Sequence, residues 1–321
     1  MARWIRVSTV SYMPVEAGDN FMERQRERLA QMAELAATAR PKADLVLFPE
    51  HCNVLGLPTL EAQIEAAEPV PGPTTERLSE VAARHGMYIV LPIPTRHGDV
   101  LHNSCVFIGR DGSIVGMYHK YQPTISEMEA GYSPGVEVPA FELDFGKVGA
   151  AICFDMKFVE VGQLMARNGA RMCLFASMFV AGDRLWHWAR DFGMYVVSSC
   201  PTHSYIVDMG GGRALAETGT DIWEVGAGYV PPIASAVINM DRCQFHLDYN
   251  GPKLKDVFAK YGHAVEVEIY RPEAHFTLAS LMDDVTVDDI IQEFELEPWT
   301  AYLDRARAER AKRLGPEPMA S

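Results

Sequence analysis

Three apolar segments of the chain each lead to a single ionisable residue. DLVLFPE ends in Glu50, IVGMYHK ends in Lys120, and KVGAAIC ends in Cys153. In open α/β sheets, ligands bind and catalytic groups collect at the carboxyl ends of the strands. A carboxylate, an ammonium group and a thiol brought to one place form a complete set for nucleophilic catalysis.

The three groups predict a division of roles. A free thiol is mostly protonated at neutral pH, and the thiolate is the nucleophile. Glu50 can take the Cys153 proton and later activate a water molecule. Lys120 supplies positive charge where a carbonyl oxygen becomes anionic. A helix predicted near residues 157–168, after Cys153, adds backbone N–H groups and its positive dipole end, which makes the Phe154 N–H a candidate second donor to that oxygen.

These segments resemble the motifs of the nitrilase, or carbon–nitrogen hydrolase, superfamily. LVLFPE carries the glutamate, HKYQP the lysine and AICFDMKFVE the cysteine, in the family's order, and the resemblance runs from about residue 4 to about residue 240. It implies a four-layer αββα sandwich and a Glu50–Lys120–Cys153 triad. It also implies no cofactor, and homodimers or larger homo-oligomers.

The resemblance further implies a second acidic residue within SEMEAGYSPG. Glu129 fits best by its distance from Tyr132 and the following PG, and Glu127 is the alternative. This carboxylate would orient Lys120 or the substrate amide. Tyr132 is a candidate for the substrate pocket.

The residues after the cysteine bear on the branch of the family. True nitrilases usually continue with tryptophan and glutamate, whereas this chain has Phe154 and Asp155. CFDMKFVE is more similar to amidases, especially ω-amidase-like members with C-Y-D-M-R-F-x-E. In those, the basic residue, here Lys157, is a candidate for holding a substrate carboxylate; a helix-surface lysine is the alternative.

We therefore expect a thiol amidohydrolase that cleaves a small non-peptide amide. The same triad could instead hydrolyse a nitrile or an N-carbamoyl group, although the arginine and tryptophan of carbamoylases are missing here. A catalytically inert binding or scaffold protein is the alternative from another class, and the intact Glu50, Lys120 and Cys153 argue against it.

One stretch departs from the family pattern. Where many relatives carry R-A-x-E-N, this chain has WARDFGMY, with Trp188 and Phe192 in place of the usual arginine and asparagine. Trp186 and its neighbours could form an aromatic pocket wall, which would favour a bulkier amide. The alternative is that they pack beneath an outer helix.

Composition limits the partners. The net charge of −14 argues against binding nucleic acid or an anionic membrane surface. We find no run of membrane-spanning length and no signal peptide at the N-terminus. The six cysteines include no C-x-x-C pair, which indicates free thiols in the cytoplasm. The ten histidines show no metal-binding spacing, so no metal site is predicted.

Strand-like and helix-like segments alternate over most of the length, which predicts one α/β domain of two sheets with helices outside. Helices are predicted over residues 21–39 and 182–192, and NSCVFIG with IVGMYHK has a hairpin signature. SYIVDMGGGRAL and GAGYVPPIASAVINMD predict a further hairpin with a turn-rich middle. We expect a hydrolase domain over residues 1–270 and a C-terminal extension over 271–321.

Overall fold

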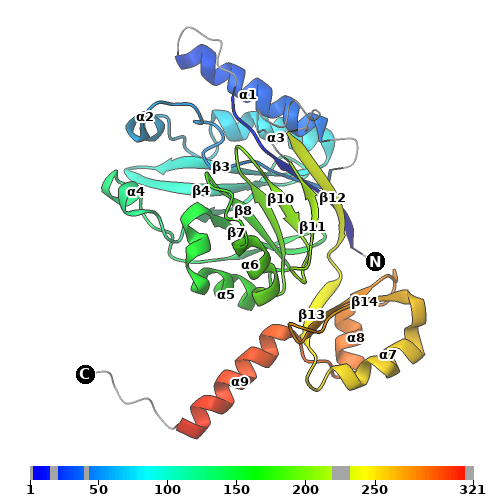
Figure 1. Cartoon of the computed structure of the whole chain (residues 1–321). Coiled ribbons are helices and arrows are strands. Elements are labelled where there is room, and N and C mark those ends of the chain that lie inside the picture. The colour runs from blue at the N-terminus through cyan, green and yellow to red at the C-terminus, as the bar shows by residue number, and fades with distance from the viewer. Residues whose placement is uncertain (1–2, 15–20, 40–42, 219–231, 315–321) are drawn as a thin grey trace, which may run out of the picture.

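The computed structural model describes residues 3–14, 21–39, 43–218 and 232–314 (Figure 1). Two six-stranded sheets contain most of the strands. In spatial order the first sheet contains β12 (Ile233–Asn239), β1 (Trp4–Val10), β2 (Leu45–Leu47), β3 (Tyr88–His97), β4 (Val100–Ile108) and β5 (Ile114–His119). The second contains β11 (Ala214–Glu217), β10 (Tyr205–Val207), β9 (Tyr195–Ser199), β8 (Met172–Ala176), β7 (Gly146–Ile152) and β6 (Ala140–Leu143).

The two sheets pack face to face with helices on the outside (Figure 1). Buried side chains from both sheets, such as Phe107 of β4 and Val148 of β7, form one continuous core. On the outer face of the first sheet lie α1 (Phe21–Thr38) and α3 (Pro73–His85), and on that of the second lie α5 (Val159–Arg167) and α6 (Arg184–Phe192). The predicted αββα sandwich is confirmed.

Strand register determines which residues meet at the edge of the second sheet. The strands β7, β8 and β9 are parallel, and Ile152 lies opposite Ala176, which lies opposite Ser199. Cys153 and Ser177 follow two of these residues directly, so they leave the sheet side by side. In the first sheet, the predicted hairpin is β4 and β5, and the Lys120 N–H donates to the Asn103 carbonyl at 2.8 Å.

The second predicted hairpin is only partly as expected. Strands β10 and β11 pair antiparallel, in agreement with SYIVDMGGGRAL. The predicted strand residues 226–231 lie outside the described ranges. The rest of that segment forms β12, which pairs antiparallel with β1 in the other sheet.

The C-terminal part forms a small unit with its own core. Its three strands lie in the order β13 (Arg242–His246), β15 (His275–Ser280) and β14 (Val265–Tyr270). Helices α7 (Leu254–Tyr261) and α8 (Val287–Glu293) accompany this sheet, and Phe245, Phe276 and Ile290 are among its buried residues. A boundary at residue 270 would remove the central strand, so we propose that the division falls near residue 240.

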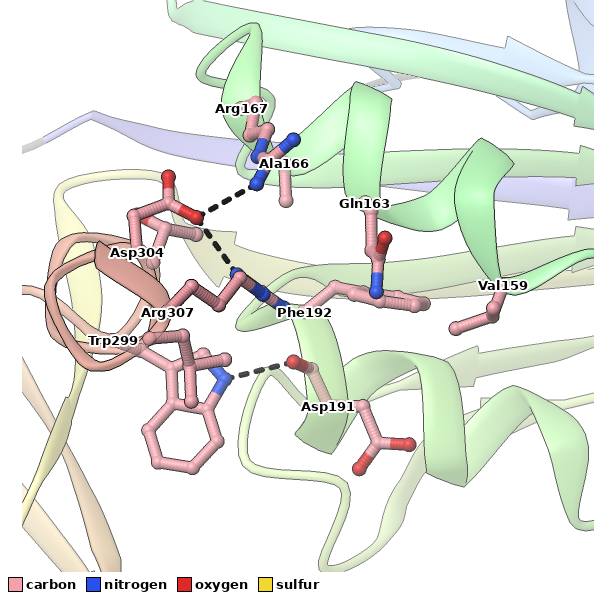
Figure 2. A pocket seen from close by; sticks show the side chains of 11 residues that line it. Val159, Gln163, Ala166, Arg167, Asp191, Phe192, Trp299, Asp304 and Arg307 are labelled. Carbon is pink, nitrogen blue, oxygen red and sulfur yellow. Dashed lines mark hydrogen bonds and ion pairs between the residues drawn. The ribbon is translucent and has the colours of Figure 1, made fainter. Parts of the chain in front are cut away.

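Helix α9 (Trp299–Leu314) leads away from this unit and passes α5 and α6 (Figure 2). Trp299 Nε1 donates to the Asp191 carbonyl at 2.7 Å, and Asp304 accepts from Arg167 at 2.9 Å and from Arg307 at 2.7 Å. No residue of α9 is buried, and its far end extends from the body (Figure 1). In the described ranges, no helix combines the length and apolar character needed to cross a membrane.

The proposed boundary can be tested by truncation after Tyr270. We expect residues 242–270 to become rapidly cleaved in limited proteolysis, because β13 and β14 would lose the strand between them and Phe245 would lose its partner Phe276, 5.1 Å away. The full-length chain is the control. Equal protection of this segment in both chains would contradict the proposed boundary.

Candidate active site

Lys120 is the centre of a buried charge cluster. It follows β5 directly, is only 1% exposed, and Nζ lies 3.0 Å from Glu50 Oε1 and 2.9 Å from Glu127 Oε2. Burial lowers the pKa of Lys120, but the negative charges of Glu50 and Glu127 raise it by more. The side chain therefore remains an ammonium group at any physiological pH.

Asn103 holds the two carboxylates in place. Its Nδ2 donates to Glu50 Oε1 at 2.8 Å and to Glu127 Oε1 at 3.0 Å. Asn103 lies on β4, beside the end of β5, because the hairpin register brings the two segments together. Charge-assisted hydrogen bonds of this kind are stronger than neutral ones, so the cluster is a rigid unit.

Glu127, not Glu129, contacts Lys120, which corrects the preference drawn from the sequence. Thr124 is the N-cap of α4 (Ile125–Glu129), and the Glu127 carboxylate turns back to accept from the Thr124 N–H at 2.7 Å. Residues two apart on a helix point in very different directions, at about 100° per residue. Glu127 is consequently buried and Glu129 is exposed.

Cys153 lies at the sharp turn after β7. Its backbone φ is +49°, a left-handed conformation that is uncommon for a residue with a side chain. Burial and the Glu50 carboxylate raise the pKa of the thiol, whereas Lys120, the Ser177 side chain and the Met178 backbone lower it, and the resulting pKa is about 12. Without a base, the thiol therefore stays protonated.

The neighbouring Glu50 is placed to act as that base. Its Oε2 accepts the Met178 N–H at 3.0 Å, and the same backbone segment interacts with Cys153. Transfer of the thiol proton to Glu50 moves a proton within the cluster, so the net charge of the buried groups does not change. An external base would instead leave an additional buried negative charge, which is far more costly.

Asp155 ties the cysteine turn to the lysine segment. Its carboxylate accepts from the Ile152 N–H at 2.9 Å, from the Tyr118 hydroxyl at 2.6 Å and from the Gln122 N–H at 2.8 Å. Burial raises the pKa of Asp155 to about 6, although these donors lower it. One side chain thus joins the two sheets on either side of the cluster.

The helix predicted near residues 157–168 is α5, and a short segment separates it from Cys153. Residues Cys153–Lys157 form a 3₁₀ helix, η1, and the α-helix begins only at Val159. The positive end of the α5 dipole therefore lies at Val159 and not at Cys153. Phe154 is half-buried, with its ring edge-on to that of Phe158 at 5.1 Å.

Tyr132, a candidate for the substrate pocket, lies close to the carboxylates of Glu127 and Glu50. Its ring stacks on that of His51 with centroids 6.1 Å apart. Burial, followed by the charges of Glu127 and Glu50, raises the pKa of its hydroxyl. Among the described residues this buried hydroxyl has no hydrogen-bond partner.

Lys157 and Trp186 lie apart from the charge cluster. Lys157 is exposed, and its Nζ lies 5.1 Å from the ring centre of Phe179, close to the Ser177–Met178 segment. Trp186 is half-buried and packs edge-on against Tyr205 at 5.2 Å.

The two departures from the family pattern pack against each other. Trp188 and Phe192 are buried in α6, with ring centroids 5.4 Å apart. Phe192 also lies over Gly162 of α5, where a Cβ atom would come within 2.1 Å of its ring. These residues therefore contribute to the packing of α6 against α5.

Glu50, His51 and Glu127 have ligand atoms within 4.8 Å of one another, a spacing that would allow a metal ion. The Lys120 ammonium group already donates to both carboxylates. A cation placed between them would have to approach this fixed positive charge. The donor set therefore fits the lysine better than a metal.

This fold, with a thiol beside a buried glutamate–lysine–glutamate cluster, is the arrangement expected of the carbon–nitrogen hydrolases. A sequence profile of the carbon-nitrogen hydrolase family matches residues 20–211, and the chain therefore belongs to this family.

Curated relatives agree with this assignment. Omega-amidase NIT2 of Homo sapiens is 30% identical over 185 residues, which cover 49% of this chain and 66% of the relative. Omega-amidase NIT2 of Danio rerio is 32% identical over 163 residues, covering 44% and 58%. The matched region spans less than two thirds of the length of these relatives.

Solved structures share the fold. Nit3 of Saccharomyces cerevisiae, a member of branch 10 of the nitrilase superfamily, has a TM-score of 0.61 at 23% identity, covering 74% of this chain and 90% of that one. An amidase from Nesterenkonia sp. has a TM-score of 0.60 at 18% identity, with the same coverage.

Sequence reasoning missed Asn103, Asp155 and the Ser177–Met178 segment. Asn103 and Asp155 are polar residues in buried surroundings, and Asn103 interrupts an apolar strand, which is the signal that could have identified it. Ser177 and Met178 act through their position beside Cys153, and this follows only from the β7–β8 register.

The choice between the two glutamates can be tested directly. We expect Glu127→Gln to lower kcat/KM by roughly 100-fold or more, the loss typical of removing one fixed electrostatic contribution to a transition state. The reason is that Lys120 would keep only one of its two carboxylate partners.

Glu129→Gln is the matched control, and we expect activity close to that of the unmodified chain because Glu129 is exposed. Ammonia release from the best amide substrate measures both, with circular dichroism to verify folding. A larger loss in the Glu129 variant would contradict the assignment.

Proposed function

We propose that this chain is a thiol amidohydrolase that cleaves the C–N bond of a small non-peptide amide through a thioester on Cys153. The observation that carries the proposal is the Lys120 ammonium group held between Glu50 and Glu127 beside a thiol that needs a base. Membership of the carbon–nitrogen hydrolase family supports the reaction class.

In the proposed acylation, Glu50 takes the Cys153 proton and the thiolate attacks the amide carbonyl carbon. The carbonyl oxygen becomes anionic, and Lys120 with the Phe154 N–H stabilises it. When the C–N bond breaks, Glu50 returns the proton to the leaving nitrogen. Ammonia or an amine departs, and the acyl group stays on sulfur as a thioester.

Deacylation uses the same groups with water in place of the thiol. Glu50 accepts a proton from water as the oxygen attacks the thioester carbon. The C–S bond then breaks, the acid is released, and the sulfur is reprotonated. The cluster returns to its starting charge, so one buried arrangement serves both halves of the reaction.

The amide branch is favoured over the alternatives by the residues after the cysteine and by the relatives named omega-amidase. Hydrolysis of a nitrile or of an N-carbamoyl group would use the same triad. An inert scaffold would not require a lysine, two carboxylates and an asparagine to be buried together, because each is costly to remove from water.

The substrate is proposed to carry a carboxylate. Lys157 is exposed near the Ser177–Met178 segment, and among the described residues no carboxylate lies within ion-pair distance of it. An unpaired ammonium group close to the Phe179 ring, on the same side as the Ser177–Met178 segment, suits the free acid end of an ω-amide. We place Tyr132 near the amide end; Trp186 is a weaker candidate because it packs on Tyr205.

The homo-oligomeric state and the cytoplasmic location remain predictions from the sequence.

The reaction class predicts the outcome of a substrate panel. We expect ammonia release from short aliphatic and aromatic primary amides, little from the corresponding nitriles, and none in Cys153→Ala. The alanine variant removes the nucleophile while leaving a small side chain in the same space. Turnover of nitriles alone would replace the amidase by a nitrilase, and no release from any compound would favour the inert scaffold.

The proposed carboxylate contact predicts a substrate-dependent effect of Lys157→Met. We expect kcat/KM for succinamate to fall roughly tenfold, the size of one charge-assisted hydrogen bond, while that for butanamide stays unchanged. Lys147→Met, at another exposed lysine, is the control. Equal losses for both substrates would show that Lys157 does not bind the carboxylate.

A further inference from the structure

The two donors proposed for the anionic oxygen come from different sheets. Lys120 follows β5 of the first sheet, whereas Phe154 lies in η1, directly after β7 of the second. Donors stabilise a developing oxyanion only when they are held at hydrogen-bond distance from the place where its charge forms. The proposed reaction therefore requires a fixed spacing between the two sheets at this point.

Asp155 uses both of its carboxylate oxygens to join the sheets here. Oδ2 accepts from the Tyr118 hydroxyl at 2.6 Å and from the Ile152 N–H at 2.9 Å, and Oδ1 accepts from the Gln122 N–H at 2.8 Å. Tyr118 and Gln122 lie two residues before and two residues after Lys120, and Ile152 is the last residue of β7. One carboxylate thus holds the segment of the ammonium group against the strand that leads to the thiol.

The Tyr118 hydroxyl is itself fixed in direction. Tyr118 is fully buried in the core between the sheets, and its oxygen accepts the Tyr121 N–H at 3.2 Å. A phenol hydroxyl can accept one hydrogen bond while it donates another. The hydroxyl therefore connects the backbone directly after Lys120 to the Asp155 carboxylate.

The first sheet holds Lys120 from the other side. The Lys120 N–H donates to the Asn103 carbonyl at 2.8 Å, and the Lys120 carbonyl accepts the Gly135 N–H at 2.8 Å. A Cβ atom at Gly135 would lie 2.3 Å from the His119 carbonyl oxygen, so this close approach requires glycine. With the lysine backbone fixed in its own sheet, the contacts of Asp155 determine where the second sheet lies relative to it.

The same carboxylate supports the turn at the thiol. Cys153 has a φ of +49°, and a strained backbone of this kind persists only where the surrounding contacts determine it. Ile152 is the N-cap of η1, and Asp155 is the third residue of that helix, so its bond to the Ile152 N–H closes the turn around Cys153. The position of the Phe154 N–H within this turn follows from that bond.

The burial of Asp155 indicates a geometric role. The residue is 0% exposed, and Ile152 and Met156 beside it belong to the apolar core. Removing a carboxylate from water is costly, and an apolar side chain in the same space would avoid that cost. A charge kept at this position is better explained by the arrangement of its neighbours than by a gain in stability.

We propose that Asp155 is a positioning residue that fixes the spacing between Lys120 and the Phe154 N–H, an inference that rests on the proposed thioester reaction. Asp155 acts through Tyr118 and Gln122, without contact to the substrate and without transfer of a proton. Loss of this connection leaves the thiol and Glu50 in place but moves the two donors relative to the carbonyl oxygen.

The variant Asp155→Asn tests the connection. Its amide nitrogen would replace either Oδ2, where it meets the Ile152 N–H, or Oδ1, where it meets the Gln122 N–H. Either orientation sets two donors against each other, so one of the two backbone contacts is lost. Asp241→Asn is the matched control, because Asp241 is also buried and accepts one backbone N–H, that of Val287, at 3.0 Å.

Two reactions of each variant are compared in mildly alkaline buffer, where Asp155 is ionised because burial raises its pKa only to about 6. The first is ammonia release from succinamate, which requires the donors to the anionic oxygen. The second is modification of Cys153 by methyl methanethiosulfonate, followed by mass spectrometry. This reagent transfers its methylthio group to the thiolate and releases methanesulfinate, so no oxyanion forms on carbon.

We expect Asp155→Asn to lower kcat roughly 100-fold, the size of a small misplacement of reacting groups, with little change in the rate of Cys153 modification. Tyr118→Phe keeps both backbone contacts and should lower kcat roughly tenfold, the loss of one hydrogen bond to a charged group. Tyr195→Phe is its control, because this buried hydroxyl also joins the sheets, at the Asn239 carbonyl 3.1 Å away. Both control variants should keep normal rates.

Normal ammonia release by Asp155→Asn would overturn the proposal, and so would equal losses in both reactions, which would indicate a general disturbance of the cysteine turn. Circular dichroism verifies folding. If Asp155→Asn does not fold, the two tyrosine variants decide, and equal kcat values for them would overturn the proposal. Absence of ammonia release from every amide by the unmodified chain would instead remove the proposed function, and this inference with it.

Discussion

The interaction on which this site depends is the burial of Lys120 between two carboxylates. An isolated ammonium group in this position would lose its charge, because removal from water is too costly. Glu50 and Glu127 keep it protonated, and Asn103 keeps the two carboxylates from separating. Loss of either Lys120–carboxylate ion pair would leave a buried charge without a partner, which is costly. This cost explains why the partners come from rigid strand ends and a capped helix.

The thiol is controlled by the same cluster. Burial and Glu50 oppose the ionisation of the thiol, while Lys120 favours it. The thiol therefore stays protonated until the neighbouring Glu50 carboxylate accepts its proton. The left-handed backbone at Cys153 is part of this arrangement, since it turns the chain sharply at the end of β7. His51, directly after Glu50, has a φ of +58°, so strain is present on both sides of the proton transfer.

Much of the fold could be predicted from the sequence because strand and helix patterns are local. Glu50, Lys120 and Cys153 were identified because each follows an apolar segment, and the structure brings the first two into direct contact. Glu127 could not be separated from Glu129 by spacing, because the choice depends on how Thr124 caps α4. The proposed boundary near residue 240, in place of the predicted one at residue 270, rests on a feature of another kind: β15 inserts between β13 and β14, and no local pattern reveals that order.

The residues of the proposed active site are divided between the two sheets. Glu50 and Lys120 follow strands of one, whereas Cys153, Ser177 and Met178 follow strands of the other. Apolar packing and the contacts of Asp155 and Met178 set the gap between them. Under mild denaturant, a slight separation of the two sheets would abolish activity, while each sheet would keep its own backbone hydrogen bonds. Hydrolytic activity would then be lost at a lower denaturant concentration than the circular dichroism signal of the strands.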